Sequence, residues 1–361
     1  MRMKIGILTF QRTSNFGSML QAFALCKAVR NLGYDCDIVD YTCVAVEDRE
    51  ALHPKFTSLR AIAKFLLFDR KLIAKGKELL AFINKQKMLS EKRYSKSELK
   101  QACEAYDIFL VGSDIVWDPK ITNNDLTFFL DFVPDTKGKI AFASSIGKEP
   151  EIGSEFWTAA FSNLKKFDGV AVREESTAKT FSEQLGKKVE WVCDPTMLLS
   201  AEEWDSVVSE RYKGENYVLV YFNSGTAIDD AIAYAKKINA KVYVINYGLP
   251  VKGAKNISVE TLEDFLSLIK YANCVFTGSY HGFLFSIYFK RDFWFYNRAH
   301  AERMLSLAGR MGLLSRDRGN ADLTDNHIDY RHVTPKVIDF RQESISWLKN
   351  AINRAGEHVD G

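Results

Sequence analysis

KIGILTFQRTSNFGSMLQAFALCKAVRNLGYDCDIVDY, residues 4–41, is the stretch that decides the fold of this chain. Residues 4–10 form an apolar run typical of a buried strand, and residues 18–32 repeat their apolar side chains with helical spacing. Gly33 ends the predicted helix, and residues 36–41 return as a second strand. A strand, a helix and a strand in this order predict a parallel sheet with crossover helices.

Short apolar runs of the same kind recur along the chain in two series. The first series continues through residues 107–111, 139–143, 169–172 and 189–193, and the second comprises residues 217–222, 241–245, 273–277 and 293–296. The interval around 194–215 lies between them and is the expected domain junction. We therefore expect an α/β protein of two doubly wound, Rossmann-like domains that face each other across a cleft.

The expected domains are an N-terminal Rossmann-like domain over 1–205 and a C-terminal one over 206–335. An amphipathic helix within 336–361 is expected to pack back on the first domain. The first domain carries a basic insertion at about 50–100, where residues 60–100 hold twelve Lys or Arg against four Asp or Glu. This composition predicts a helical hairpin with a solvated basic face. The alternative is a surface that meets an anionic membrane or a lipid-phosphate acceptor.

The overall composition is that of an ordinary globular protein. A net charge of +3 over 361 residues gives no electrostatic reason to expect a nucleic-acid partner. The six cysteines form no C-x-x-C pair, which argues against a zinc ribbon, and no acidic or histidine cluster has metal-ligand spacing, so no metal is expected. Without a signal peptide or an apolar stretch of about 20 residues, the expected location is the cytoplasm, with the inner face of the membrane as a peripheral alternative.

Two loops at the expected carboxyl ends of strands resemble each other. Residues 107–111 run into GSD (112–114), and residues 273–277 run into GSYHG (278–282). Ligands of open α/β sheets bind beyond the carboxyl ends of the strands. The second loop also opens a predicted helix, whose N–H groups and dipole favour an anion. His281 is therefore placed to touch that anion or to move a proton.

Other polar residues follow strands in the same way. Arg173 comes directly after residues 169–172, where a guanidinium can bind a carboxylate or phosphate through two bonds, although Glu174 is an alternative, purely structural partner. Asp194 ends another strand and is interpreted as a turn or cap residue. Trp117 is either a core aromatic or a stacking platform for a sugar face, and both interpretations stay open.

The loop after the first strand contains no G-x-G-x-x-G, and the chain contains no G-x-x-x-x-G-K-[ST]. Neither a dinucleotide nor an ATP- or GTP-binding P-loop is therefore indicated. Asn15, Gly17 and Gln21, which lie in this loop and the helix after it, can supply polar contacts to a hydroxyl-rich ligand.

Taken in order, these segments resemble the polysaccharide pyruvyl transferase family. The resemblance rests on KIGILTF, NFGSMLQAFAL, FLVGSDIVW, FASSIG, AVREES, CDPTMLL with EEW, and TGSYHGFLFSIYF. It extends from residue 4 to about residue 300 and leaves out residues 50–100. The family pattern after Gly-Ser-Asp reads Gln-x-Trp, whereas Ile115 stands here. If that glutamine contacts the acceptor, this departure implies a different acceptor specificity.

The resemblance implies a GT-B-like fold and transfer of a pyruvyl group from phosphoenolpyruvate, without a cofactor, onto a saccharide or lipid-linked saccharide as a cyclic ketal, in surface or exopolysaccharide biosynthesis. Arg173 and His281 match the donor-binding and catalytic pair, and Asp114 is the candidate base for a sugar hydroxyl. The candidate substrate-binding residues are Asn15, Gly17, Gln21, Ser113, Trp117, Ser279, Tyr280 and Gly282.

Two other functions fit the same sequence. One is a GT-B glycosyltransferase that uses a nucleotide-sugar, because a fold does not fix its donor. Stabilisation by UDP or GDP instead of phosphoenolpyruvate would identify it. The other is a non-catalytic glycan-binding module, for which His281→Ala and Arg173→Ala would spare the biological effect.

Overall fold

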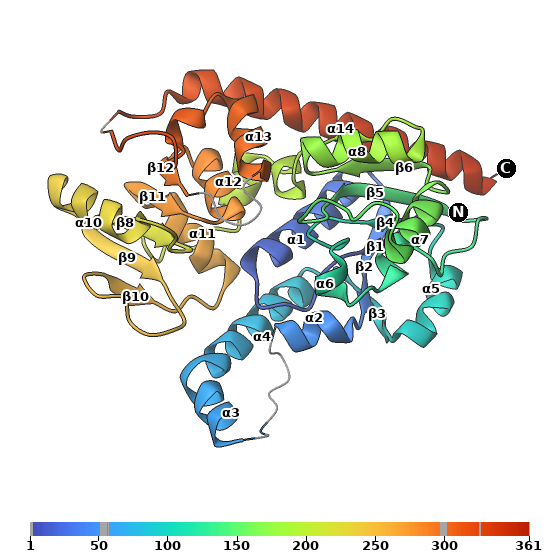
Figure 1. Ribbon diagram of the computed structural model, residues 1–361, viewed down its shortest axis with the longest axis horizontal. Helices are drawn as coiled ribbons and strands as arrows, with labels where there is room; N and C mark the ends of the chain where they lie inside the picture. The colour runs from blue at the N-terminus through green and yellow to red at the C-terminus, as the bar shows by residue number, and fades with distance from the viewer. Residues whose placement is uncertain (1–2, 51–55, 57, 297–301, 325, 361) are drawn as a thin grey trace. The chain divides into compact units, whose positions relative to one another are not determined.

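The structure, a computed structural model, describes residues 3–50, 56, 58–296, 302–324 and 326–360 (Figure 1). Residues 51–55 and 57 of the expected insertion therefore lie outside the described residues. The chain divides into two compact units. Unit 1 contains Met1–His53, Leu80–Leu199 and Ile338–Gly361, and unit 2 contains Pro54–Leu79 and Ser200–Val337.

Unit 1 is built on a seven-stranded sheet in the order β3-β2-β1-β4-β5-β6-β7, and every pair of neighbouring strands is parallel. The apolar strands β1 and β4 lie at its centre and are almost completely buried, as parallel strands covered on both faces must be. The strands are β1 (Lys4–Leu8), β2 (Asp35–Tyr41), β3 (Leu89–Tyr94), β4 (Ile108–Val111), β5 (Gly138–Ser144), β6 (Gly169–Val172) and β7 (Glu190–Trp191).

Helices connect these strands, and the first of them shows why the local sequence folds as it does. Helix α1 starts after its N-cap Asn15, buries most of its residues and ends before Gly33, which has a positive φ of 94° as the sequence predicts. The helices are α1 (Phe16–Asn31), α2 (Val44–Arg49), α5 (Leu99–Ala105), α6 (Pro119–Thr122), α7 (Glu155–Leu164) and α8 (Glu175–Leu185), with short 3₁₀ turns η2 (Lys96–Glu98), η3 (Leu126–Phe129) and η4 (Pro195–Leu198).

The long helix α14 (Tyr330–Asp360) lies against the sheet of unit 1 through its C-terminal half (Figure 1). Leu348, Ile352 and Ala355 on this half are fully buried. The first residues of β5 and β6 are glycines, and a Cβ added at Gly138 would lie 2.8 Å from the Cβ of Ala355. Glycine at this position therefore allows the helix to approach the sheet closely.

Unit 2 is built on a five-stranded parallel sheet in the order β10-β9-β8-β11-β12. Its strands are β8 (Tyr217–Tyr221), β9 (Lys241–Ile245), β10 (Lys255–Ile257), β11 (Cys274–Thr277) and β12 (Asp292–Phe295). Its helices and turns are α3 (Leu59–Lys64), the π-helical turn η1 (Phe65–Asp69), α9 (Ala201–Asp205), α10 (Ala227–Lys237), α11 (Leu262–Lys270), α12 (Tyr280–Tyr288), α13 (Glu302–Met311) and η5 (Leu314–Arg316). Helix α4 (Arg70–Lys85) begins in unit 2 and ends in unit 1.

The predicted fold class is confirmed, because both sheets are parallel and their strand order runs outward in both directions from the first strand of each unit. The predicted helical hairpin over residues 60–100 is wrong in its second half. Residues 89–94 form the edge strand β3, whose three consecutive polar side chains Glu91, Lys92 and Arg93 are exposed. An edge strand can carry such residues, so its sequence lacks the apolar pattern of a buried strand.

The units differ from the expected domains in three places, the smallest being that unit 2 ends at Val337 and not at residue 335. The long segment of unit 1 ends at Leu199, whereas the sequence suggests a boundary after residue 205. Residues 54–79, expected within the first domain, group with unit 2. One contact within unit 2 is consistent with the grouping of the first part of α4, up to Leu79, because the ammonium of the buried Lys75 lies over the ring of Tyr247, 4.2 Å from its centroid. Among the described residues, none of the helices has the length and apolar character needed to cross a membrane.

Candidate active site

The strand order of unit 1 reverses direction between β1 and β4, which are paired in parallel from Ile5 and Ile108 to Leu8 and Val111. Such a reversal leaves a crevice at the carboxyl ends of the two strands, where open α/β sheets bind their ligands. The loop after β1 begins at Thr9 and the loop after β4 contains the GSD motif. Both loops carry sequence-predicted site residues.

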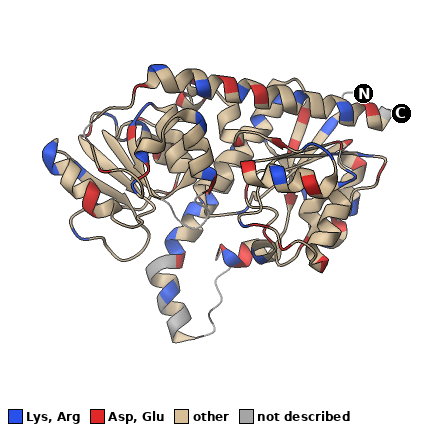
Figure 2. Ribbon diagram, turned by 45° about the horizontal axis from the view of Figure 1, so that its top comes forward, with Lys and Arg blue, Asp and Glu red and all other residues tan. Residues whose placement is uncertain are grey.

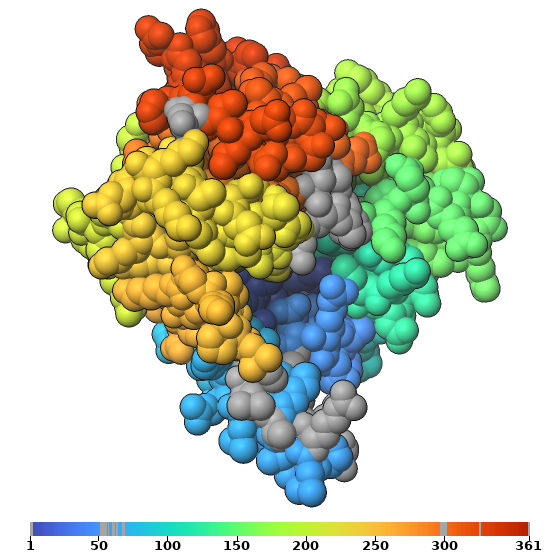
Figure 3. Space-filling model, turned by 60° about the vertical axis from the view of Figure 1, so that its left-hand side comes forward, coloured from blue at the N-terminus to red at the C-terminus, as the bar shows by residue number. Residues whose placement is uncertain are grey.

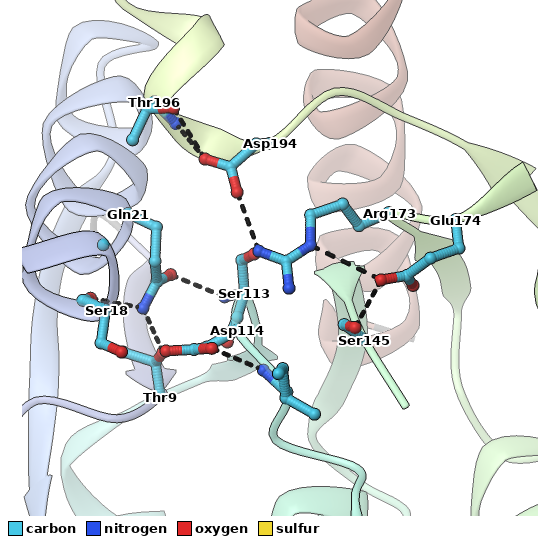
Figure 4. A network of polar contacts seen from close by, with 12 residues as sticks. Thr9, Ser18, Gln21, Ser113, Asp114, Ser145, Arg173, Glu174, Asp194 and Thr196 are labelled. Atoms are coloured by element: carbon cyan, nitrogen blue, oxygen red, sulfur yellow. Dashed lines mark hydrogen bonds and ion pairs between the residues drawn. The ribbon is translucent and has the colours of Figure 1, made fainter. Parts of the chain in front are cut away.

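Gln21 of α1 ties these two loops together (Figure 4). Its side-chain Nε2 donates to the hydroxyl of Thr9 at 2.9 Å and to the carbonyl oxygen of Ser18 at 2.7 Å. Its Oε1 accepts a bond from the backbone N–H of Ser113 at 2.9 Å. The side chain is fully buried and both of its ends are bonded. Gln21 therefore positions the loop after β4, which is a different role from the ligand contact that the sequence suggests.

Two other predicted contacts also have structural roles. The exposed Asn15 caps α1, with its Oδ1 accepting from the N–H of Gly17 at 2.8 Å. Trp117 is fully buried and stacks on Phe129 and Phe181, with ring centroids 5.2 Å and 5.7 Å away. These contacts favour the core interpretation of Trp117, because a ring enclosed by aromatic neighbours has no face to offer a sugar.

Ser113 and Asp114 are the residues of this site with unused bonding capacity. Asp114 has a positive φ of 75°, and its Oδ1 accepts from the N–H of Ile115 at 2.8 Å. The other carboxylate oxygen of Asp114 and the hydroxyl of Ser113 are buried and have no hydrogen-bond partner in the part of the chain that the structure describes. Buried polar atoms without partners are costly, and they are found where a ligand or water completes the bonding. A strained backbone at such a position is a further feature of functional sites.

A comparison of two buried serines tests this interpretation. Ser113→Ala is expected to leave the free energy of unfolding unchanged or slightly higher, because its hydroxyl has no hydrogen bond to lose among the residues that the structure describes. Ser145→Ala is expected to lower it by about 1–3 kcal/mol, because that hydroxyl donates to Glu174. Urea unfolding of both variants measures the difference. A loss in Ser113→Ala as large as that in Ser145→Ala would show that Ser113 is bonded within the protein.

Arg173 lies in a buried ionic cluster at the carboxyl end of β6 (Figure 4). Its side chain is 1% exposed, and its Nη1 lies 2.9 Å from Oδ2 of the fully buried Asp194. Its Nε lies 3.7 Å from Oε1 of Glu174. The other oxygen of Asp194 accepts from the N–H and the hydroxyl of Thr196 at 2.9 Å and 2.8 Å. The cap role predicted for Asp194 is confirmed, but its role as the partner of Arg173 has no local sequence signal.

Unit 2 has an equivalent reversal between β8 and β11. At the end of β11 the hydroxyl of Thr277 donates to the carbonyl oxygen of Tyr221 at 2.9 Å and accepts from the N–H of Ser279 at 3.0 Å. The hydroxyl of Ser279 caps α12 by accepting from the N–H of Gly282 at 3.3 Å. Burial raises the pKa of Tyr221, and a side-chain hydrogen bond with Ser279 opposes that shift. The loop after β11 is thus held by hydrogen bonds at the ends of both β8 and β11.

His281 is the second residue of α12, where backbone N–H groups and the helix dipole favour an anion. It is partly buried, and its ring lies edge-on to Tyr280 at 5.6 Å between centroids. The guanidinium of Arg303 lies over the ring of Tyr280, 5.2 Å from its centroid. A Cβ at Gly282 would lie 2.4 Å from the hydroxyl of Thr277, so this glycine is required by packing.

The structure thus brings Ser113, Asp114 and Arg173 to the carboxyl end of one sheet and His281 to the carboxyl end of the other. Sequence reasoning missed Ser145, and it missed Asp194 as an ion-pair partner. Within the described ranges, no three His, Cys, Asp or Glu side chains form a group that could hold a metal ion.

Solved structures with a similar fold have very different sequences. A glycosyltransferase from Streptomyces nogalater is 11% identical, with a TM-score of 0.40, over 99% of this chain and 100% of its own. A UDP-GlcNAc 2-epimerase from Neisseria meningitidis bound to UDP-GlcNAc is 12% identical, with a TM-score of 0.49, over 98% and 96%. A putative UDP-N-acetylglucosamine 2-epimerase from Listeria monocytogenes is 11% identical, with a TM-score of 0.46, over 97% and 91%.

No curated protein sequence matches the chain. A sequence model of one family, polysaccharide pyruvyl transferase, does match it, over residues 15–300. The match contains the GSD loop after β4, Arg173 and the helix start at His281. It covers well over half of the chain, so we conclude that this protein belongs to the polysaccharide pyruvyl transferase family.

Proposed function

We propose that this protein transfers the pyruvyl group of phosphoenolpyruvate to two hydroxyls of a saccharide, forming a cyclic ketal and releasing phosphate. The observation that carries the proposal is the family match over residues 15–300. The buried oxygens of Ser113 and Asp114 that have no partner among the described residues support it, because a hydroxyl of an acceptor can satisfy both of them.

The proposed reaction balances with the donor and acceptor alone. A proton added to the methylene carbon of the donor makes a methyl group and leaves carbon 2 electrophilic. The first sugar hydroxyl adds to carbon 2 and loses its proton, and the bond to the phosphate oxygen then breaks. The second hydroxyl adds to the same carbon and loses its proton. One of the two hydroxyl protons replaces the proton used on the methylene carbon, and the other leaves with phosphate.

We assign these steps to residues by their chemistry. Asp114 accepts the proton of a sugar hydroxyl through the carboxylate oxygen that has no partner among the described residues. His281, at the start of α12, acts as the acid or binds the phosphate, which the helix terminus also favours. Arg173 is the candidate donor-binding group. Because Asp194 and Glu174 already balance its charge, a donor carboxylate would have to compete with them for the guanidinium.

The acceptor in this proposal is a saccharide or lipid-linked saccharide of surface polysaccharide biosynthesis. An open groove at the carboxyl ends of β2 and β3, on the same sheet edge as Asp114, has suitable polar groups. In it, Arg93 bonds the hydroxyl of Thr42 at 2.8 Å and a carboxylate oxygen of Glu47 at 2.6 Å. The groove is lined by Thr42, Val44, Glu47, Asp48, Arg93, Ser95 and Glu98.

The test is phosphate release from phosphoenolpyruvate across a panel of surface-glycan precursors, with mass spectrometry of the saccharide. We expect acceptor-dependent phosphate release and a saccharide that has gained a carboxyethylidene group. A thermal-shift assay should show stabilisation by phosphoenolpyruvate and none by UDP or GDP. Stabilisation by a nucleotide alone, with turnover of a nucleotide-sugar, would replace this proposal with glycosyl transfer. Binding of a glycan without any turnover would indicate a non-catalytic module.

A further inference from the structure

Residues 56–79, which we call the arm, expose apolar side chains in an unusual concentration. The exposed fractions are 57% for Phe56, 87% for Leu59, 39% for Ile62 and 58% for Leu66. Of the eleven large apolar residues that are exposed among the described residues, these four fall within eleven consecutive positions. Single exposed apolar residues are ordinary on protein surfaces, but a contiguous group marks an interaction site.

The spacing of these residues places them on one side of the helical run. Leu59, Ile62 and Leu66 are separated by three and four positions, which is the repeat of one helix face. Phe56 adds to the same group, since its ring meets that of Phe65 edge-on at 5.0 Å between centroids. The run from α3 through η1 extends away from the five-stranded sheet of its unit (Figure 1).

Basic side chains accompany the apolar face. The arm contains six Lys or Arg and two Asp or Glu, a net charge of +4, and of the six, Lys75 is buried. Lys64, Arg70, Lys71 and Lys77 are exposed, and Figure 2 shows basic residues along α3 and α4. Asp69, one of the two acidic residues, is buried and already lies 3.3 Å from Lys64. In Figure 3 the light-blue atoms of the arm lie at the surface of the face in view, at its lower end.

The base of the arm is fixed to the body of unit 2. Lys75 is 6% exposed and lies over the ring of Tyr247, and Leu79 is fully buried. The four exposed apolar residues therefore belong to a segment that is held at its C-terminal end.

We infer that the arm binds the surface of an anionic lipid bilayer, with Phe56, Leu59, Ile62 and Leu66 inserted at the interface and the basic residues on the lipid headgroups. This combination of an aliphatic and aromatic face with flanking Lys and Arg is what interfacial helices use. The run from α3 through η1 has eleven residues and rises roughly half the thickness of a hydrocarbon core, and it continues into the basic helix α4, so the apolar run lies in the interface and does not cross the bilayer. The positive charge selects a bilayer over a neutral protein surface.

The test is co-flotation of the full chain with vesicles of phosphatidylcholine, with or without phosphatidylglycerol, in the absence of donor and acceptor. We expect binding only to the anionic vesicles, and a strong loss when salt is raised to about 1 M, where the Debye length is about 3 Å. Leu59→Ser with Leu66→Ser, and separately Lys71→Glu with Lys77→Glu, should each lower partitioning about tenfold or more. The matched controls are Leu249→Ser and Lys252→Glu. Both side chains are exposed and lie outside the arm, Leu249 with an exposed fraction of 76%, so neither substitution should change the partitioning onto vesicles.

Three outcomes would overturn the inference: no flotation with anionic vesicles at low salt, flotation that the arm variants leave unchanged, or a wild-type dimer that the Leu59→Ser and Leu66→Ser substitutions convert to monomer. The last outcome would assign the apolar face to a second copy of this chain, and light scattering of the same samples detects it. Because the assay contains no substrate, its result is separate from the outcome of the pyruvyl-transfer assay.

Discussion

Asp114→Asn is expected to lower kcat for phosphate release from phosphoenolpyruvate by about 10²–10⁴-fold, which is the range for the loss of one catalytic proton transfer. The carboxylate oxygen without a partner among the described residues becomes an amide group, which cannot accept a proton from a sugar hydroxyl. The KM for phosphoenolpyruvate should change little, because the proposal places the donor's anionic groups on other residues.

Asp114→Asn tests the proton-transfer role of the side chain and not its effect on folding, because asparagine fits this position. Asn, like Asp, tolerates the positive φ of 75° better than most side chains. Its Oδ1 can also keep the hydrogen bond from the N–H of Ile115. The free energy of unfolding should therefore stay close to that of the wild type.

Asp118→Asn is the matched control, four residues away in the same loop. Asp118 is buried and caps α6 by accepting from the N–H of Lys120 at 2.8 Å, and asparagine is an equally good cap. This variant should keep wild-type activity. If Asp114→Asn also retained activity within a few-fold of wild type while folding normally, Asp114 would not be the base.

The fold could be predicted from the sequence wherever burial on both faces of a sheet produces an apolar run. This condition holds for β1, β4 and β8, and each was predicted within a few residues. It fails at one edge of each sheet, at β3 and β10, whereas the edge strands β7 and β12 overlap the predicted runs 189–193 and 293–296. Strand β3 has three exposed polar residues in succession, and the short edge strand β10 is largely exposed, so neither has the apolar pattern.

The site was predictable to the extent that its residues follow strands directly. Arg173 follows β6 directly and Asp114 comes three positions after the end of β4, and the structure places both at the carboxyl end of the sheet of unit 1. The partners of these residues were not predictable. Arg173 lies closer to Asp194, 21 positions away, than to its neighbour Glu174, because the parallel pairing of β6 and β7 sets this contact. Similarly, no local pattern could show that Gln21 bonds Ser113, 92 positions away.

Asp194→Ala is expected to lower the free energy of unfolding by about 3–5 kcal/mol, the usual cost of leaving a buried charge without its partner. Arg173 would lose its contact at 2.9 Å to the carboxylate, and the N–H and hydroxyl of Thr196 would lose the carboxylate oxygen that accepts from both of them. Urea unfolding followed by tryptophan fluorescence measures the loss. Glu190→Gln is the control, because its ion pair with Lys188, which is 80% exposed, contributes less than about 1 kcal/mol.

A double variant shows whether Asp194 stabilises the protein as the ion-pair partner of Arg173 or through its other contacts. Arg173→Met with Asp194→Ala removes both charges, and replacing a buried ion pair by apolar groups is often neutral or stabilising. The double variant should therefore be more stable than Asp194→Ala alone, although Glu174 loses its contact with Arg173 and keeps its bond from Ser145. If instead the two losses simply added, the guanidinium and the carboxylate would not be coupled. Asp194 would then stabilise unit 1 through its cap on η4, and the ionic cluster would not hold the loop after β6 in place.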